Sequence, residues 1–95
     1  MDKPRIIYSN HAVKQMFKRA ISTKEVEYTL RNGEIIQEYP ADKPYPSKII
    51  FAYCNKRPLH LVYSYNIEED TYIIITTYEP SPELWKDDFK TRRNQ

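Results

Sequence analysis

The sequence lacks most of the residues that mark several common kinds of site. Its 95 residues include one glycine and one cysteine. A single glycine excludes the Gly-rich loops that hold phosphate groups in nucleotide-binding proteins. The single cysteine, Cys54, cannot form an internal disulfide, and its apolar neighbours indicate an inert buried thiol. Two histidines and one cysteine, far apart in sequence, predict neither a metal site nor a bound cofactor.

Long hydrophobic runs are also missing. No apolar stretch approaches the ~20 residues that a membrane-spanning helix needs, so no membrane association is expected. The first residues, which include Lys3 and Arg5, contain no apolar segment that could act as a signal peptide. These absences predict a cytoplasmic protein.

What is present suits one folded domain over residues 1–95. Hydrophobic residues make up 40% of the chain and aromatic residues 14%, which argues against disorder. The net charge is only +2, but residues 1–33 carry seven Lys and Arg side chains against three acidic ones. A basic half suits a polyanion such as RNA, although a solvated helical surface would have the same composition.

The N-terminal third predicts two helices. Ser9 and Asn10 supply N-cap chemistry for a helix over residues 11–20. The apolar side chains of this helix have the spacing of a stripe that faces the core, and they are Val13, Met16, Phe17 and Ala20.

The second helix has clear signals at both ends. Residues 22–25 match a capping box, in which Ser22 and Glu25 satisfy free N–H groups, and the helix is expected to run to about Arg31. Its inner side would carry Val26, Thr29 and Leu30. Gly33 follows the helix, where it predicts a left-handed C-cap.

The rest of the chain predicts strands. Short turns separate β-rich runs at residues 34–39, 47–54, 59–66 and 71–78, which indicates antiparallel neighbours. Residues 6–8 form a short extended lead-in that could be an edge strand, and residues 81–83 could start a short C-terminal helix carrying Trp85. The expected fold class is therefore α+β, with two N-terminal helices, a four-stranded antiparallel sheet and a short C-terminal helix.

Several residues could carry metal-free RNA cleavage, which needs a base, an acid and a cation at the phosphate. His60 interrupts an apolar strand, and pairing of the last two strands would set it across from Thr76 or Thr77, with Tyr78 nearby. His11 begins the first helix. The two histidines could share the proton transfers, because imidazole titrates near neutral pH.

Other side chains would bind the RNA. Arg19 offers a planar fork for phosphate oxygens, and Tyr78 could orient the substrate or stack on a base. We also expect RNA contacts from Lys14, Lys18, Thr77 and Arg92. Each site residue has a structural alternative: His60 as a satisfied sheet residue, His11 as a surface residue, Arg19 as a partner of Glu25, and Tyr78 as core.

One resemblance covers nearly the whole chain. It rests on the strings Tyr8-Ser9-Asn10-His11-Ala12, Asn32-Gly33-Glu34-Ile35-Ile36, Arg57-Pro58-Leu59-His60 and Thr76-Thr77-Tyr78. These resemble a small prokaryotic domain family of unknown function, numbered forty-two fifty-eight. That family in turn looks like a member of the RelE-like, or barnase–EndoU–colicin–RelE, superfamily of small toxins and ribonucleases.

The resemblance implies helices packed on one face of an antiparallel sheet, with a substrate cleft on the sheet's open side. It also implies metal-independent endoribonuclease activity, often with an antitoxin protein as partner. The positions carried over are His11, Arg19, His60 and the Thr77-Tyr78 step. The alternatives are a non-catalytic RNA-binding domain and a protein-interaction module of the same fold. The target RNA and the oligomeric state stay open.

Overall fold

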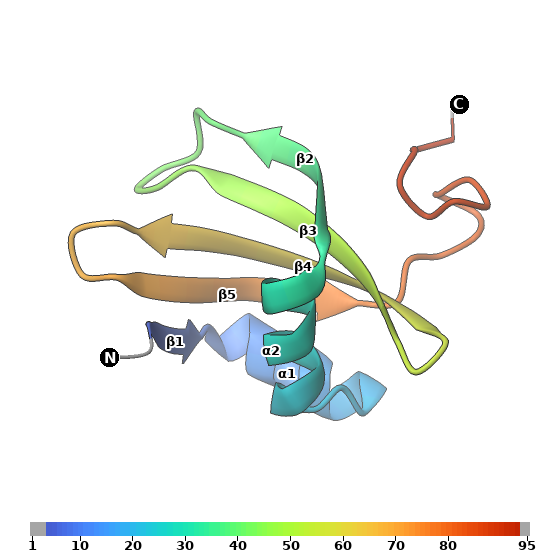
Figure 1. The fold of residues 1–95 in the computed structure, drawn as a ribbon, viewed down its shortest axis with the longest axis horizontal. Helices are drawn as coiled ribbons and strands as arrows, with labels where there is room; N and C mark the ends of the chain where they lie inside the picture. The colour runs from blue at the N-terminus through green and yellow to red at the C-terminus, as the bar shows by residue number, and fades with distance from the viewer. Residues whose placement is uncertain (1–3, 94–95) are drawn as a thin grey trace.

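The computed structural model of the protein describes residues 4–93, which form two helices and five strands. Their order is β1 (Arg5–Tyr8), α1 (Asn10–Arg19), α2 (Thr23–Asn32), β2 (Glu34–Tyr39), β3 (Ser47–Cys54), β4 (Arg57–Asn66) and β5 (Thr71–Tyr78). The strands form one sheet in the order β1-β5-β4-β3-β2. Both helices lie on one side of this sheet, α1 over β5 and α2 over β3 and β4 (Figure 1).

The sheet corrects the expected architecture, because it is mixed and has five strands. The additional strand, β1, pairs with β5 in parallel, from Arg5 opposite Thr71 to Tyr8 opposite Ile74. The other pairs are antiparallel, as predicted. Residues 6–8 belong to the edge strand that the sequence left open, but so short a run could not establish the strand or its partner. Its partner, residues 71–74, lies far along the sequence, where local patterns give no information on pairing. The fold class remains α+β, but the prediction of a four-stranded antiparallel sheet was wrong.

The C-terminal segment, residues 79–93, corrects the expected short helix. It closes one turn, in which the N–H of Trp85 bonds to the carbonyl of Ser81 at 2.9 Å. The Asp88 carboxylate then accepts two backbone N–H groups that follow it, and Phe89 adopts a left-handed conformation with φ of 59°. Because such local bonds compete with a helix, the chain turns back and Trp85 pairs with Arg92.

Helix α1 begins at its N-cap Ser9 as predicted, but it buries a different side. Ala12 and Met16 are 0% and 8% exposed, whereas Val13 is 52% and Phe17 91% exposed. The Ser9 hydroxyl accepts the N–H of Ala12 and also donates to a carbonyl of β5 at 2.9 Å. This bond fixes the rotation of α1 about its axis so that Ala12 faces the sheet. The predicted core stripe was therefore wrong for Val13 and Phe17, and also for the exposed Ala20.

Helix α2 confirms the predicted capping box and inner face. Ser22 and Glu25 exchange both capping bonds, and Val26 and Thr29 are buried with Leu30 partly covered. Gly33, however, is extended, with φ of −76° and ψ of 170°, so the predicted left-handed cap was wrong. The left-handed C-cap is Ala20 at the end of α1, with φ of 55° and ψ of 47°.

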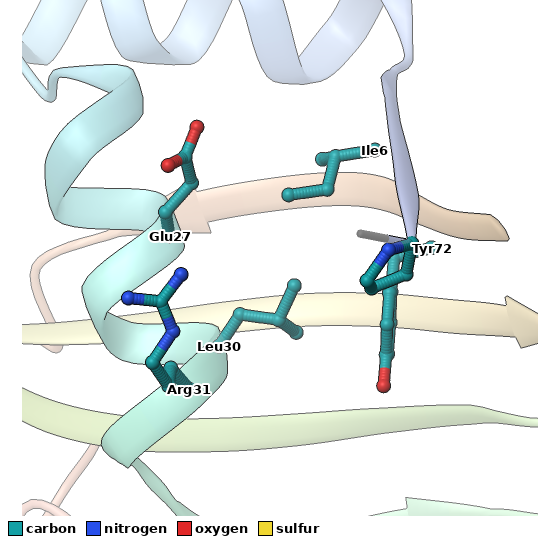
Figure 2. Close-up of a pocket in the computed structure, with 6 residues that line it drawn as sticks. Ile6, Glu27, Leu30, Arg31 and Tyr72 are labelled. Atoms are coloured by element: carbon teal, nitrogen blue, oxygen red, sulfur yellow. The ribbon is translucent and has the colours of Figure 1, made fainter. Parts of the chain in front are cut away.

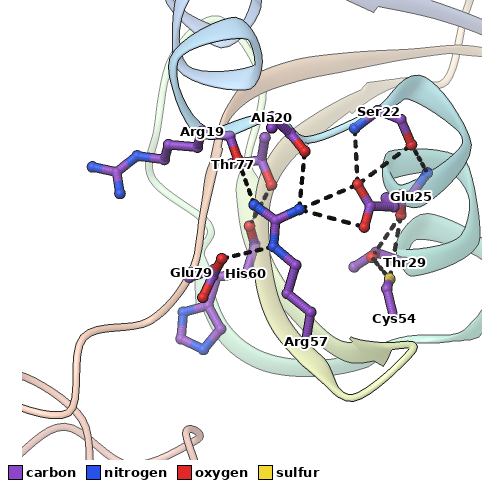
Figure 3. Close-up of polar contacts among 10 residues, drawn as sticks. All are labelled: Arg19, Ala20, Ser22, Glu25, Thr29, Cys54, Arg57, His60, Thr77 and Glu79. Atoms are coloured by element: carbon purple, nitrogen blue, oxygen red, sulfur yellow. Dashed lines mark hydrogen bonds and ion pairs between the residues drawn. The ribbon is translucent and has the colours of Figure 1, made fainter.

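Arg57, the first residue of β4, joins the ends of three elements. Its guanidinium donates to the carbonyl of Ala20 at 3.0 Å and to that of Arg19 (Figure 3). It also pairs with Glu25 at 3.5 Å and with Glu79 at 2.7 Å. Because helix C-termini leave carbonyls free, a cation there stabilises the end of α1 and ties it to α2 and β5.

Candidate functional site

Side-chain alternation along β4 separates the two faces of the sheet. Leu59 and Leu61 pack with the helices in the core, so His60 between them points to the opposite side. Directly opposite His60 are Phe51 on β3 and Tyr78 on β5. Opposed residues share a face, so Phe51, His60 and Tyr78 belong to what we call the helix-free face.

The C-terminal segment covers His60. The imidazole lies edge-on to the Trp85 ring, with a centroid distance of 4.5 Å, and is 0% exposed. Its Nε2 lies 2.6 Å from the carbonyl oxygen of Phe89, which can only accept, so Nε2 carries the hydrogen. Nδ1 is then the acceptor for the Tyr78 hydroxyl at 3.3 Å. Burial lowers the pKa of His60, against the smaller opposing effect of the bond to Phe89, so the ring is neutral at neutral pH.

Tyr78 is the half-buried neighbour of His60 on this face. Burial raises the pKa of its hydroxyl, Tyr39 raises it further, and the positive charge of Arg92 partly opposes both. The phenol is therefore protonated at neutral pH, with its hydrogen directed at Nδ1 of His60. Its oxygen lone pairs remain able to accept a further hydrogen bond.

Arg92 supplies the cation of the helix-free face. Its guanidinium carbon lies 5.4 Å from the centroid of the Trp85 ring, a cation–π contact, and the residue is exposed. The nearby Lys90 and Arg93 each have a carboxylate partner, at 2.9 Å and 3.5 Å. Within the part of the chain that the structure describes, Arg92 has no such partner, so its charge is available to a ligand.

Two further tyrosines extend the aromatic surface. Tyr53 lies two residues after Phe51 on β3 and therefore shares its face, with the two ring centroids 5.1 Å apart. Tyr39 of β2 pairs with Ser47, which lies on that same face of β3. Tyr53 is 51% exposed and Tyr39 is 39% exposed. Sequence reasoning missed both as site residues. The period-two alternation along residues 47–53 was the signal that could have placed Tyr53 beside the face of His60.

The structure divides the predicted site residues into three groups. His60, Tyr78 and Arg92 come together on the helix-free face. The second group lies on α1, on the side of the sheet opposite the helix-free face. Its members are all exposed, and they are His11, Lys14, Lys18 and Arg19. The structure therefore does not bring His11 and His60 to one groove, and they cannot act on the same phosphate. Arg19 bonds to Gln15 through its side chain, at 3.0 Å.

Thr77 forms the third group by itself. It is 1% exposed, lies opposite Leu61 and donates from its hydroxyl to the carbonyl of His60 at 2.8 Å (Figure 3). This contact leaves the Thr77 side chain no surface for a ligand. Its observed contact supports the pairing of β4 with β5 beneath the candidate site.

A separate cavity of 510 Å³ lies on the helix side of the sheet, between α2 and β1 (Figure 2). Ile6, Leu30 and Tyr72 give it apolar walls, and Glu27 and Arg31 border it. It contains none of the predicted site residues. Among residues 4–93, no cluster of three or more His, Cys, Asp or Glu side chains is arranged to hold a metal ion. Neither described helix has the length and apolarity needed to cross a membrane.

A family model described as a domain of unknown function, DUF4258, matches residues 8–79. The chain belongs to the DUF4258 family. The match includes α1, α2 and strands β2 to β5, so the sheet positions of His60 and Tyr78 are part of the DUF4258 domain. Trp85, Phe89 and Arg92, which cover or border the candidate site, follow the matched residues. No curated protein matches the chain.

Proposed function

We propose that this DUF4258 domain binds single-stranded RNA on its helix-free face. One observation carries the proposal: a guanidinium that has no acidic partner among residues 4–93 lies over Trp85, which covers the sheet face that carries the tyrosine rings. Arg92 has the planar fork that matches two phosphate oxygens. Tyr39 and Tyr53 offer exposed rings, and stacking of a base on an aromatic ring contributes about 1–3 kcal/mol.

The ligand would be single-stranded because its bases must leave their own stack to meet the tyrosine rings. The resemblance of the sequence to RelE-like toxins and ribonucleases supports the same class of ligand. An antitoxin protein would then be a second partner, expected by the same resemblance. The helix-free face, and not α1, would be the RNA surface.

Replacing Arg92 tests RNA binding. We expect Arg92→Gln to weaken binding of a labelled single-stranded oligonucleotide about tenfold, which corresponds to about 1.4 kcal/mol. The dependence of log K on log salt should also become shallower by about 0.7, the share of one phosphate contact on a single strand. Fluorescence anisotropy at several salt concentrations measures both quantities.

Arg31→Gln is the matched control, because Arg31 is an exposed arginine on α2, across the sheet. It should leave the affinity within about twofold. A Lys14→Gln/Lys18→Gln variant separates the two predicted RNA surfaces. If that variant weakens binding more than Arg92→Gln does, the RNA lies on α1 and the proposal is wrong. No measurable affinity of the wild-type domain at low salt would also overturn it.

A second candidate function, metal-independent RNA cleavage of the toxin type, is favoured by the hydrogen bond from Tyr78 to His60. The Tyr78 oxygen could take the proton of a ribose 2′-OH while passing its own proton to Nδ1 of His60. The 2′-oxygen would then form a bond to phosphorus as the bond from phosphorus to the 5′-oxygen breaks. Water would protonate the leaving 5′-oxygen, and Arg92 would stabilise charge on the phosphate.

Tyr78→Phe distinguishes cleavage from binding alone. It removes the proton-carrying hydroxyl and keeps the ring, so we expect cleavage to fall about 10²-fold or more while RNA affinity changes less than about twofold. His11→Gln is the control and should leave the rate unchanged, since His11 lies across the sheet. Equal cleavage by Tyr78→Phe and wild type would rule out this role. A wild-type domain that binds RNA but leaves it intact would be a non-catalytic RNA-binding domain.

A further inference from the structure

An apolar stripe on α1 is left uncovered by the residues that the structure describes. Phe17 is 91% exposed, and Val13, one turn earlier, is 52% exposed. Ala20 continues the stripe and is also exposed. Val13 and Phe17 are four residues apart and are therefore neighbours on the helix surface. Ala20, which ends the helix, lies beside Phe17, so the three side chains form one apolar ridge. The core of the domain does not account for it, because α1 faces the sheet through Ala12 and Met16.

A shallow surface hollow of 530 Å³ adjoins this ridge, and we call it the α1 hollow. Met16 and Ile21, which are 8% and 4% exposed, contribute to its lining. Phe17 and Ala20 also line it, together with Ser22 at the start of α2. An exposed aromatic residue beside an apolar hollow is the kind of anchor that carries most of the binding energy in protein interfaces.

The helix that presents this surface is held at both ends. Ser9 caps its first turn, and at its last turn the N–H of Ile21 bonds to the carbonyl of Met16 at 2.8 Å. Arg57 donates to the last two carbonyls of the α1 region, those of Arg19 and Ala20. A surface that is ordered before binding loses less conformational entropy when a partner docks.

The charges around the α1 hollow indicate the chemistry of the partner. Lys14 and Lys18 follow Val13 and Phe17 directly in sequence and are exposed beside the ridge. Helix α1 contains no acidic residue, and its last turn also holds Arg19. Two copies of this helix would therefore repel each other if their basic sides met. An acidic surface is the electrostatic complement of the ridge and its lysines.

We propose that the α1 hollow is the docking site for an acidic amphipathic helix of a partner protein. The apolar side of that helix would cover Val13 and Phe17, and its carboxylates would face Lys14 and Lys18. A ridge with i, i+4 spacing suits a second helix, whose own ridges can pack beside it. Nucleic acid suits the site less well, because the lining holds one aromatic ring, that of Phe17, beside aliphatic side chains that give a base no further ring for stacking. The α1 hollow lies across the sheet from the helix-free face, so this proposal does not depend on RNA binding.

The test uses the full chain and a defined probe, a fluorescein-labelled helical peptide. Leucines at i, i+3, i+4 and i+7 form one face of the peptide, with glutamate and alanine elsewhere. We expect saturable binding by fluorescence anisotropy, weakened at least about tenfold by Phe17→Ala and by Lys14→Glu/Lys18→Glu. A second peptide with lysine in place of glutamate should bind at least about tenfold more weakly than the first.

Ile67→Ala is the matched control, because Ile67 is another exposed hydrophobic side chain, at 79%, in the turn between β4 and β5. It should bind the acidic peptide as the wild type does. The proposal is overturned if the acidic peptide does not bind, or if Phe17→Ala and Ile67→Ala behave alike. It is also overturned if both peptides bind equally.

Two further measurements exclude other occupants of the α1 hollow. Concentration-dependent dimers in sedimentation that disappear in Phe17→Ala would assign the ridge to a second copy of the chain. A loss of RNA affinity in Phe17→Ala, with peptide binding unchanged, would assign it to nucleic acid. Either result would overturn the proposal. An unchanged melting temperature of Phe17→Ala, expected for an exposed side chain, shows that the comparison is made on folded protein.

Discussion

At the scale of single residues, alanine and glycine occupy the ends of the two helices in an unusual way. Ala20 adopts the left-handed conformation that ends α1, although a Cβ there costs about 1–2 kcal/mol. Gly33 ends α2 in an extended conformation that any residue could adopt. Its requirement is space: a Cβ on Gly33 would lie 2.6 Å from Cγ1 of Ile50 and 2.9 Å from the carbonyl oxygen of Phe51.

Reciprocal substitutions test this assignment. We expect Gly33→Ala to lower the free energy of unfolding by about 1–3 kcal/mol, because backbone atoms of α2 and β3 must move to admit the methyl group. Ala20→Gly should raise it by about 0.5 kcal/mol, since the relief of left-handed strain exceeds the backbone entropy that glycine loses. Urea denaturation of both variants measures the changes. A stabilising Gly33→Ala would show that the close contacts relax without cost.

The same residues show what sequence can reveal at this scale. Ser9 and Ser22 mark the starts of both helices, because N-cap chemistry is local and depends on neighbouring residues only. The reason for Gly33 is not local, since the atoms that exclude a Cβ include a side chain and a carbonyl of β3. Gly33 therefore predicted the end of α2 correctly, but the left-handed conformation predicted for Gly33 itself was wrong.

At the scale of elements, the C-terminal segment is attached to the sheet through a buried imidazole. His60 donates to the carbonyl of Phe89, and its ring packs edge-on against Trp85. His60 is held in its neutral form, since burial lowers its pKa. The contacts that attach the C-terminal segment to the sheet therefore favour the neutral imidazole of His60 over the charged one.

This attachment predicts a pH dependence of stability. The unfolded chain takes up a proton at His60 as the pH falls through 6.5, while the folded chain, with its lower pKa, does not. The unfolded state is therefore favoured as the pH falls from 6.5 toward the folded pKa, by at most about 1.4 kcal/mol per pH unit. Urea denaturation at several pH values measures this slope. His60→Gln should reduce this slope, and an identical slope in His60→Gln would assign it to other groups.

The strand boundaries agree with the sequence prediction wherever the residues of the turn itself indicate the turn. Strands β2, β3 and β5 match the predicted runs, but β4 begins at Arg57, earlier than expected. Asn55 and Lys56 both have positive φ, 52° and 71°, and form a two-residue hairpin loop that leaves Arg57 paired with Cys54. Such loops usually contain glycine. Without one, the sequence indicated a longer turn.

At the scale of the whole molecule, the sequence indicated the α+β class and missed how distant parts meet. It could not set the register that pairs His60 with Tyr78, nor predict that Trp85 and Phe89 would cover His60. It also could not fix the rotation of α1, which depends on a bond from Ser9 to β5. The candidate site was therefore predicted in part: three of its residues were named, but the histidine on α1 belongs to the other side of the sheet.

The parallel pairing of β1 with β5 has a consequence for synthesis on the ribosome. Of the described elements, β1 leaves the ribosome before the others, and domains generally acquire structure as their residues emerge. Residues 5–8 must nevertheless wait for residues 71–74, because those are the residues with which β1 pairs. Until then the two helices have no complete sheet to cover, and the apolar side chains that pack between them and the sheet stay exposed in the nascent chain. Completion of this fold is thus tied to β5, which is translated after the other four strands of the described sheet.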